Sequence, residues 1–175
     1  VSVLFGDGMT PNAVDPSCSG GVDLEHVSGL YLGTWSANVM SSDGAGNTGS
    51  LELEGYLGFS GSFNDDAGYD VGFIAYTYPS VDAWDFEELY ISFDFFGVYV
   101  MYAAGIDDAN DYTEIGYGID AGPGRFYISY GDYENKGTKD REGYDWTVGG
   151  VKLGLYYQDF SHDTTASSDE DGAYF

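Results

Sequence analysis

The stretch SLELEGYLGFSGSF, residues 50–63, alternates two kinds of side chain along its whole length. Its odd-numbered positions are leucine, phenylalanine or glycine, while its even-numbered positions include Glu52, Glu54 and Tyr56. Successive side chains of a β-strand point to opposite faces of the sheet, whereas a helix repeats every ~3.6 residues. The stretch therefore predicts a long strand with one apolar face and one polar face.

The same period of two recurs along most of the chain. It is regular in residues 68–79, 86–96, 112–120, 125–133 and 151–158, and less regular in residues 20–27, 29–39, 97–106 and 144–150. The intervening stretches are rich in Gly, Asp, Asn, Ser and Pro, which favour turns, and they lie at 41–50, 64–68, 107–111, 121–124 and 134–143. The pattern predicts an all-β antiparallel meander of about 10–12 strands.

The charge of the chain is strongly one-sided. Thirty Asp and Glu face five Lys and Arg among 175 residues, for a formal net charge of −25. The basic residues all follow residue 124 and are Arg125, Lys136, Lys139, Arg141 and Lys152. Such a chain repels phosphate backbones, which excludes nucleic acid as a partner. With 43% hydrophobic residues it folds, and residues 1–175 are expected to form a single domain.

Two architectures satisfy the alternation: a β-sandwich with the uncharged face packed inward, and a transmembrane barrel with that face turned to lipid. The pattern by itself does not separate them. Strand signals of ten or more residues favour the barrel, since globular strands are usually ~5–6 residues long. Tyr and Trp near the strand ends, such as Trp35, Trp84 and Trp146, also match the aromatic girdles of membrane barrels.

A resemblance to a known family adds to this interpretation. SGGVDLEHVSGLYLGTWSANV (19–39) and GYDVGFIAYTYP (68–79), together with the order of the later strands up to about residue 160, resemble the TorF family of porins of proteobacterial outer membranes. The residues that fit are Gly20, Gly21, Asp23, His26, Ser28, Gly29, Tyr31, Gly33, Trp35, Asn38, Val39, Tyr69, Asp70, Gly72, Tyr76, Tyr78 and Pro79. The opening VSVLFGDG and the closing DEDGAYF depart from that family's pattern. The resemblance implies an outer-membrane barrel.

If the strands close into such a barrel, their alternation assigns each side chain to the lumen or to lipid. The predicted lumen-lining residues are Asp23, Glu25, Glu52, Glu54, Asp70, Glu88, Asp94, Glu114, Asp120, Arg125 and Lys152. The predicted lipid-facing residues are Leu51, Leu53, Leu57, Phe59, Val71, Phe73, Leu89, Ile91, Phe93, Ile115, Ile119, Phe126, Ile128, Val151, Leu153 and Leu155. A lumen lined in this way favours cations. Adaptation of an acidic chain to a salty habitat is the competing explanation.

No catalytic constellation or cofactor motif is found. His26, His162 and Cys18 lack the spacing of a zinc site, and no GxSxG or phosphate-binding loop occurs. We therefore expect neither an enzyme nor a resident metal or cofactor. The acidic loops, including Asp65 and Asp66, are interpreted as solvated. Lys136, Lys139 and Arg141 fall in the predicted turn at 134–143 and are also interpreted as solvated, with lipid phosphates as the alternative.

The sequence thus predicts a porin-like channel of the bacterial outer membrane for passive diffusion of small solutes, with cations favoured. Its expected partners are outer-membrane lipids and small solutes or cations, and self-association into a homo-oligomer is compatible with this. The alternative from another class is a non-conducting structural or surface-assembly β-protein, either a filled barrel or a secreted sandwich. A secreted acidic module for sugar or calcium is a third hypothesis.

Overall fold

The computed structural model describes residues 2–5, 19–39, 41–42, 48–49, 51–107, 109–149, 151–163 and 170–174. The strands are β1 (Ser2–Phe5), β2 (Ser19–Glu25), β3 (Leu30–Ala37), β4 (Ser41–Ser42), β5 (Thr48–Gly49), β6 (Glu52–Asn64), β7 (Ala67–Thr77), β8 (Phe86–Phe95), β9 (Val98–Gly105), β10 (Tyr112–Ala121), β11 (Gly124–Tyr133), β12 (Gly137–Val148), β13 (Val151–His162) and β14 (Glu170–Tyr174). The described helical structure is one 3-10 turn, η1 (Asp82–Trp84). None of the described helices is both long and apolar enough to cross a membrane.

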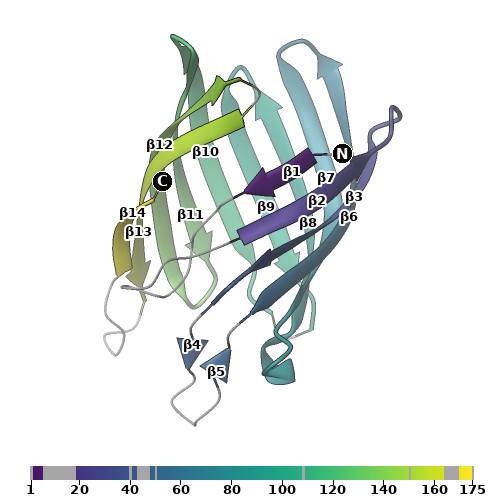
Figure 1. Ribbon diagram of the computed structural model, residues 1–175, viewed down its shortest axis with the longest axis vertical. Helices are drawn as coiled ribbons and strands as arrows, with labels where there is room; N and C mark the ends of the chain where they lie inside the picture. The colour runs from purple at the N-terminus through teal and green to yellow at the C-terminus, as the bar shows by residue number, and fades with distance from the viewer. Residues whose placement is uncertain are drawn as a thin grey trace. The chain divides into compact units, whose positions relative to one another are not determined.

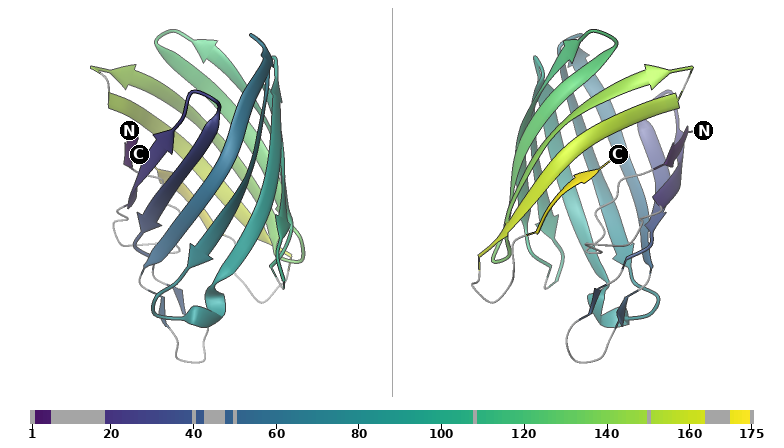
Figure 2. Two further views of the ribbon diagram at one scale, coloured as in Figure 1. Left: turned by 90° about the vertical axis from the view of Figure 1, so that its right-hand side faces the viewer. Right: turned by 60° about the vertical axis from the view of Figure 1, so that its left-hand side comes forward.

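The strands form a meander, as expected from the short turns between them. One 12-stranded sheet runs in the order β1-β2-β3-β6-β7-β8-β9-β10-β11-β12-β13-β14, and β4 and β5 form a separate two-stranded sheet (Figure 1). The ladders of β10 with β11 and of β12 with β13, for example, are antiparallel. The long strands β12 and β13 are seen side by side again in the two further views of Figure 2. The all-β antiparallel meander is therefore confirmed.

The chain divides into two compact units, which are described separately here. The first unit comprises Val1–Gly61, Asp70–Tyr90 and Gly105–Ala109. The second unit comprises Ser62–Tyr69, Ile91–Ala104 and Asn110–Phe175. The first therefore holds β1 to β5, most of β6 and β7, and the beginning of β8. The second holds β10 to β14 and most of β9.

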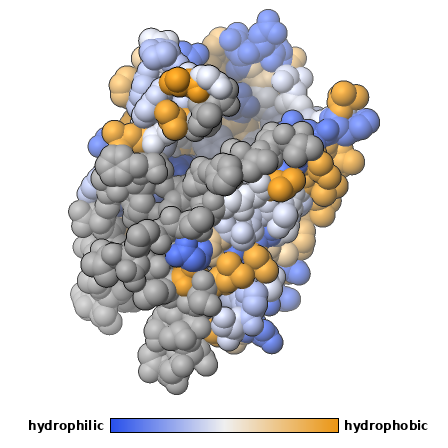
Figure 3. All heavy atoms as spheres, viewed as in Figure 1, coloured by the Kyte–Doolittle hydropathy of each residue, from blue (hydrophilic) through white to orange (hydrophobic). Residues whose placement is uncertain are grey.

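Burial is inverted with respect to an ordinary globular protein. Among the described side chains the buried apolar residues are few, namely Ala37, Val39, Ala67, Val81, Ala103 and Tyr112. Leu57 is 55% exposed and Ile128 59% exposed, whereas Glu114 and Gln158 are each only 5% exposed. Apolar side chains, drawn in orange, accordingly lie on the surface in Figure 3. In β8 and β10, for example, Glu88 and Glu114 lie on the more buried face, and Leu89 and Ile115 lie on the exposed one.

One predicted turn is wrong. The stretch ENKGTKDREG was expected to be a loop because it is rich in charge and glycine, yet β12 begins at Gly137 and pairs with β11 through Tyr133↔Gly137. Only residues 134–136 form the turn. Hydrogen bonding along two long neighbours, β11 and β13, overrides the low strand preference of these residues.

The hairpin between β8 and β9 gives a test of the fold. Gly97 has φ +84, and a Cβ added there would lie 2.5 Å from the carbonyl oxygen of Gly118. Gly149 has φ +59, but nothing lies within 4 Å of an added Cβ. Both positions disfavour a side chain through φ, by about 1–2 kcal/mol, and only Gly97 adds a clash with backbone. We predict that Gly97→Ala lowers the free energy of unfolding, measured by urea titration, clearly more than Gly149→Ala does. Equal losses would contradict this register.

Candidate functional site

Tyrosine hydroxyls and carboxylates are paired on the polar face of the first unit. The Tyr31 hydroxyl, from β3, donates a hydrogen bond to Asp70 Oδ1 on β7 at 2.5 Å. The hydroxyls of Tyr31 and Tyr90 are also hydrogen-bonded to each other. Since the single proton of Tyr31 goes to Asp70, Tyr90 is the donor to Tyr31. These hydrogen bonds join β3, β7 and β8 across one face.

Two further pairs repeat this chemistry. The Tyr56 hydroxyl donates to Asp23 Oδ1, and the Tyr78 hydroxyl donates to Glu52 Oε2. Tyr78 directly follows β7, and its burial, followed by its hydrogen bond to Glu52, raises the pKa of its hydroxyl above the usual range. Tyr78 therefore stays a neutral donor. Tyrosine takes the place that Lys or Arg usually occupies beside a buried carboxylate.

A group of glutamates lies beside the Tyr78 pair. The Glu54 side chain lies close to the side chains of Glu52 and Glu88. The hydroxyl of Tyr76 donates to Glu88 Oε2 at 3.3 Å. The first 124 residues contain no Lys or Arg, so the first unit has neither of these cations to neutralise this group. Its potential is strongly negative.

The tyrosines reach these positions because glycine lies beneath their rings. An added Cβ at Gly58, the cross-strand partner of Tyr31, would collide with the Tyr31 ring. At Gly72 an added Cβ would lie 2.5 Å from the Tyr90 hydroxyl oxygen. The absent side chain thus makes room for a flat ring against the sheet. Glycine at these positions therefore allows a tyrosine of the neighbouring strand to lie flat on the sheet.

The polar face of the second unit is organised around one carboxylate and two cations. Glu114 Oε2 lies 3.7 Å from Lys139 Nζ, and Glu114 Oε1 lies 3.7 Å from Arg141 Nη2. The side chains of Glu114 and Lys139 are 6% and 11% exposed. The Tyr112 hydroxyl donates a further hydrogen bond to Glu114. Glu114 thus faces two cations, and these three side chains form the positive cluster.

Aromatic rings hold the two cations in place. Lys139 Nζ lies 4.8 Å from the centroid of the Tyr112 ring, which stacks on Tyr133 at 4.1 Å. Arg141 lies over Tyr127, with 5.6 Å between its guanidinium carbon and the ring centroid. Such contacts replace part of the hydration that the cations lose on burial. The side chains of Lys139 and Arg141 are 11% and 27% exposed.

The residues predicted to line a lumen fall into two groups. Asp23, Glu52, Glu54 and Asp70 are half-buried, and Glu88 and Glu114 are buried. Glu25, Asp94, Asp120 and Arg125 are exposed and lie at or next to strand ends, where Arg125 pairs with Asp120 at 3.2 Å. The side chain of Lys152 lies outside the described part of the structure. The structure brings Glu52, Glu54 and Glu88 together in one unit and gives Glu114 different partners.

The residues predicted to face lipid are mostly exposed. These are Leu51, Leu57, Phe59, Val71, Leu89, Ile91, Phe93, Ile115, Ile119, Phe126, Ile128, Leu153 and Leu155. Leu53 and Phe73 are half-buried, and the side chain of Val151 is not among those described. The exposed and the half-buried faces therefore follow the alternation of the sequence, while the medium that the exposed face meets remains a prediction.

Sequence analysis missed the positive cluster. Lys139 and Arg141 were interpreted as solvated loop residues, which is wrong for Lys139 (9% exposed) and for Arg141, which is only partly exposed and pairs with Glu114. The usable signal was the alternation of Gly137, Lys139, Arg141 and Gly143 with larger or acidic residues, which continues the period of two into the predicted turn. The tyrosine–carboxylate pairs were also missed, because no local pattern connects residues on different strands.

Metal ligands are not gathered in the part of the chain that the structure describes. No group of three or more His, Cys, Asp and Glu suited to a metal ion is found among those residues. Asp65 and Asp66 are exposed at the turn between β6 and β7, as interpreted.

These observations define a class: an all-β meander with an exposed apolar face and an acidic, tyrosine-rich polar face. Residues 7–173 match the family described as "Bacterial protein of unknown function (Gcw_chp)". The match spans almost the whole chain, and the protein belongs to this family. No curated protein and no solved structure matches the chain.

The cluster around Glu114 gives a stability prediction. Glu114→Gln removes the carboxylate charge that faces Lys139 and Arg141, and removing one partner of a buried pair costs about 3–5 kcal/mol. The matched control is Asp120→Asn, which breaks the exposed Asp120–Arg125 pair and should cost at most about 1 kcal/mol. Chemical unfolding of both variants measures the difference. Similar losses would show that the cluster is hydrated.

Proposed function

We propose that this protein is an outer-membrane β-barrel through which small solutes diffuse passively, with cations favoured. In this proposal the strands of the 12-stranded sheet close on one another, the exposed apolar face contacts lipid, and the polar face encloses water. The observation that carries the proposal is the inverted burial of the strands.

Inverted burial supports a membrane location because exposing apolar side chains to water is unfavourable. Leu57, Leu89 and Ile115 are each more than half exposed, and many other apolar side chains are exposed in the same way. Monomeric proteins in water rarely expose apolar patches larger than several hundred Å². In hydrocarbon the same face is favourable, and the polar groups of the backbone are satisfied by the ladders. A sandwich with this face packed inward would require these side chains to be covered.

Cation preference rests on the charge of the polar face. In the first unit Glu52, Glu54 and Glu88 lie close together, and tyrosine hydroxyls supply hydrogen bonds without supplying charge. Negative potential near a low-dielectric wall concentrates cations and repels anions. The positive cluster of Lys139 and Arg141 in the second unit moderates this preference locally.

The proposal agrees with the resemblance of residues 19–39 and 68–79 to the TorF family of porins, and it places the protein in the bacterial outer membrane. Outer-membrane lipids and small solutes are its partners. The proposed channel is narrow, because wide aqueous pores are found in barrels of about 16–18 strands. Neither a cofactor nor catalysis is part of the proposed activity.

A non-conducting structural barrel is the second candidate. It is favoured by one observation, the packing of Tyr31 and Tyr90 over Gly58 and Gly72, which fills the polar face of the first unit with rings. A barrel of this size is filled by side chains when they are large. Conductance separates the two functions.

Membrane insertion can be tested on the exposed face. Leu89→Arg introduces a charge at a side chain that is 54% exposed. In a bilayer this costs about 2–4 kcal/mol near the midplane, whereas in water an exposed substitution changes stability by about 0.5 kcal/mol or less. We predict that Leu89→Arg strongly lowers the fraction of chain that folds into lipid vesicles. Heat-modifiable gel migration measures this fraction. Release of the wild-type chain into buffer without detergent would contradict the proposal.

Ion preference can be tested with two neighbouring glutamates of β8. Glu88 lies on the polar face and is 9% exposed, while Glu87 lies on the exposed face. In planar bilayers under a salt gradient, we predict that Glu88→Gln moves the reversal potential toward zero and that Glu87→Gln leaves it unchanged. Absence of any wild-type conductance would favour the structural alternative. A preference for anions would overturn the cation proposal.

A further inference from the structure

The exposed face of the second unit carries three carboxylates among its apolar side chains. Asp140 and Glu142 on β12 and Asp159 on β13 lie on the same face as the exposed apolar residues of β10 and β11. The register places them in two adjacent rows. One row is Ile115, Tyr130, Asp140 and Asp159, and the other is Tyr117, Ile128, Glu142 and Tyr157.

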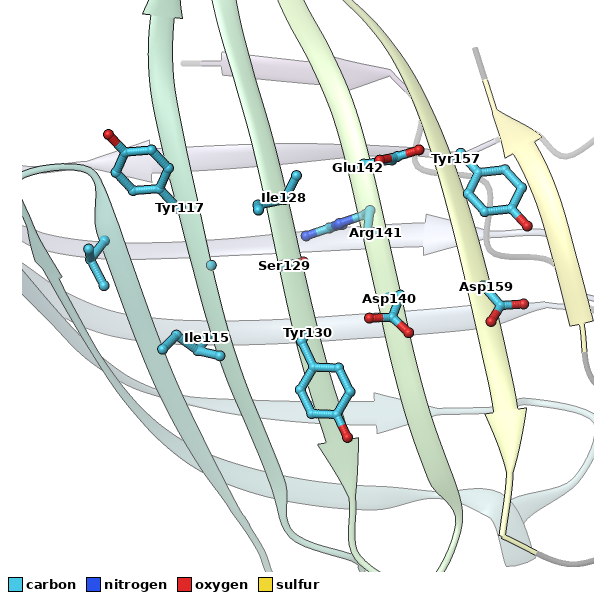
Figure 4. Close-up of a pocket in the computed structure, with 12 residues that line it drawn as sticks. Ile115, Tyr117, Ile128, Ser129, Tyr130, Asp140, Arg141, Glu142, Tyr157 and Asp159 are labelled. Carbon is cyan, nitrogen blue, oxygen red and sulfur yellow. The ribbon is translucent and has the colours of Figure 1, made fainter.

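An open pocket occupies this part of the face. It has a volume of about 780 Å³ and is lined by residues of both rows (Figure 4). The view shows Tyr117, Ile128, Glu142 and Tyr157 following one another across the four strands, with Ile115, Tyr130, Asp140 and Asp159 in the row beside them. Small-molecule sites usually have volumes of about 300–1,000 Å³ and combine apolar walls with a few polar groups. The pocket has the size and composition of such a site.

The charges of the pocket identify the kind of ligand. Asp140 and Asp159 are direct cross-strand partners, and like charges in that relation destabilise a sheet unless a cation lies near them. Arg141 also borders the pocket, but its guanidinium faces Glu114 on the other side at 3.7 Å. Tyrosine rings attract cations through their faces. Carboxylates and rings together suit an organic ammonium group.

We propose that this pocket binds an amphipathic organic cation, with the ammonium group at Asp140, Glu142 and Asp159 and the apolar part against Ile115 and Ile128. A second copy of the chain is a poor occupant, because its net charge of −25 repels the patch. The same carboxylates repel a phosphate headgroup. The pocket lies within one unit, so the proposal is independent of whether the chain conducts.

Isothermal titration of the full chain in a nonionic detergent tests the proposal. The probes are phenylbutylamine and its uncharged counterpart phenylbutanol. We predict saturable binding of the amine, at least about tenfold tighter than the alcohol, and a further loss of about tenfold on Glu142→Gln. Tyr130→Leu should weaken the amine more than the alcohol.

The control separates a site from general attraction to an acidic protein. Asp132→Asn removes an exposed carboxylate from β11, two residues from Tyr130 and outside the pocket lining, and should change the affinity by less than about twofold. Equal losses for Asp132→Asn and Glu142→Gln would overturn the proposal, as would equal affinity for the two probes. Circular dichroism of each variant confirms that it is folded, as expected for substitutions on an exposed face.

Discussion

The two-sidedness of the β-strand is the constraint on which this structure depends. Every side chain of a strand points to one face or the other, so a sequence that alternates apolar and polar residues produces two chemically distinct surfaces. In this protein the apolar surface is the exposed one, and the surface that carries Glu88 and Glu114 is buried. The antiparallel ladders pair the backbone N–H and C=O groups. The side-chain interactions on the polar surface offset the cost of burying its charged and polar groups.

The two units solve that problem with different chemistry. In the first unit, which has no Lys or Arg, the donors to carboxylates are neutral tyrosines such as Tyr31 and Tyr78. The negative charge is therefore retained. In the second unit Lys139 and Arg141 surround Glu114, and aromatic rings compensate their lost hydration. The proposed cation preference follows from the first arrangement, and the local positive charge follows from the second.

The exposed face is not uniform either. Asp140, Glu142 and Asp159 interrupt the apolar surface at neighbouring positions of β12 and β13. Carboxylates are disfavoured in hydrocarbon, so the proposed ligand site would interrupt the proposed lipid contact in this region. The inferred site for an organic cation and the proposed lipid contact thus both belong to the exposed face of the sheet, whereas the proposed lumen belongs to the polar face.

The amino-acid sequence by itself determined most strands, the meander and the two faces. Alternate side chains of a strand point to opposite faces, so the period of two can be read from each segment without knowledge of its neighbours. Leu57 and Glu54 could be assigned to opposite faces without any coordinates. Only the tertiary structure decided which side chains meet. The contacts of Tyr31 with Asp70 and of Glu114 with Lys139 depend on the register between strands far apart in sequence. The start of β12 at Gly137 was likewise decided by hydrogen bonding to its neighbours, which no local preference of these charged residues reveals.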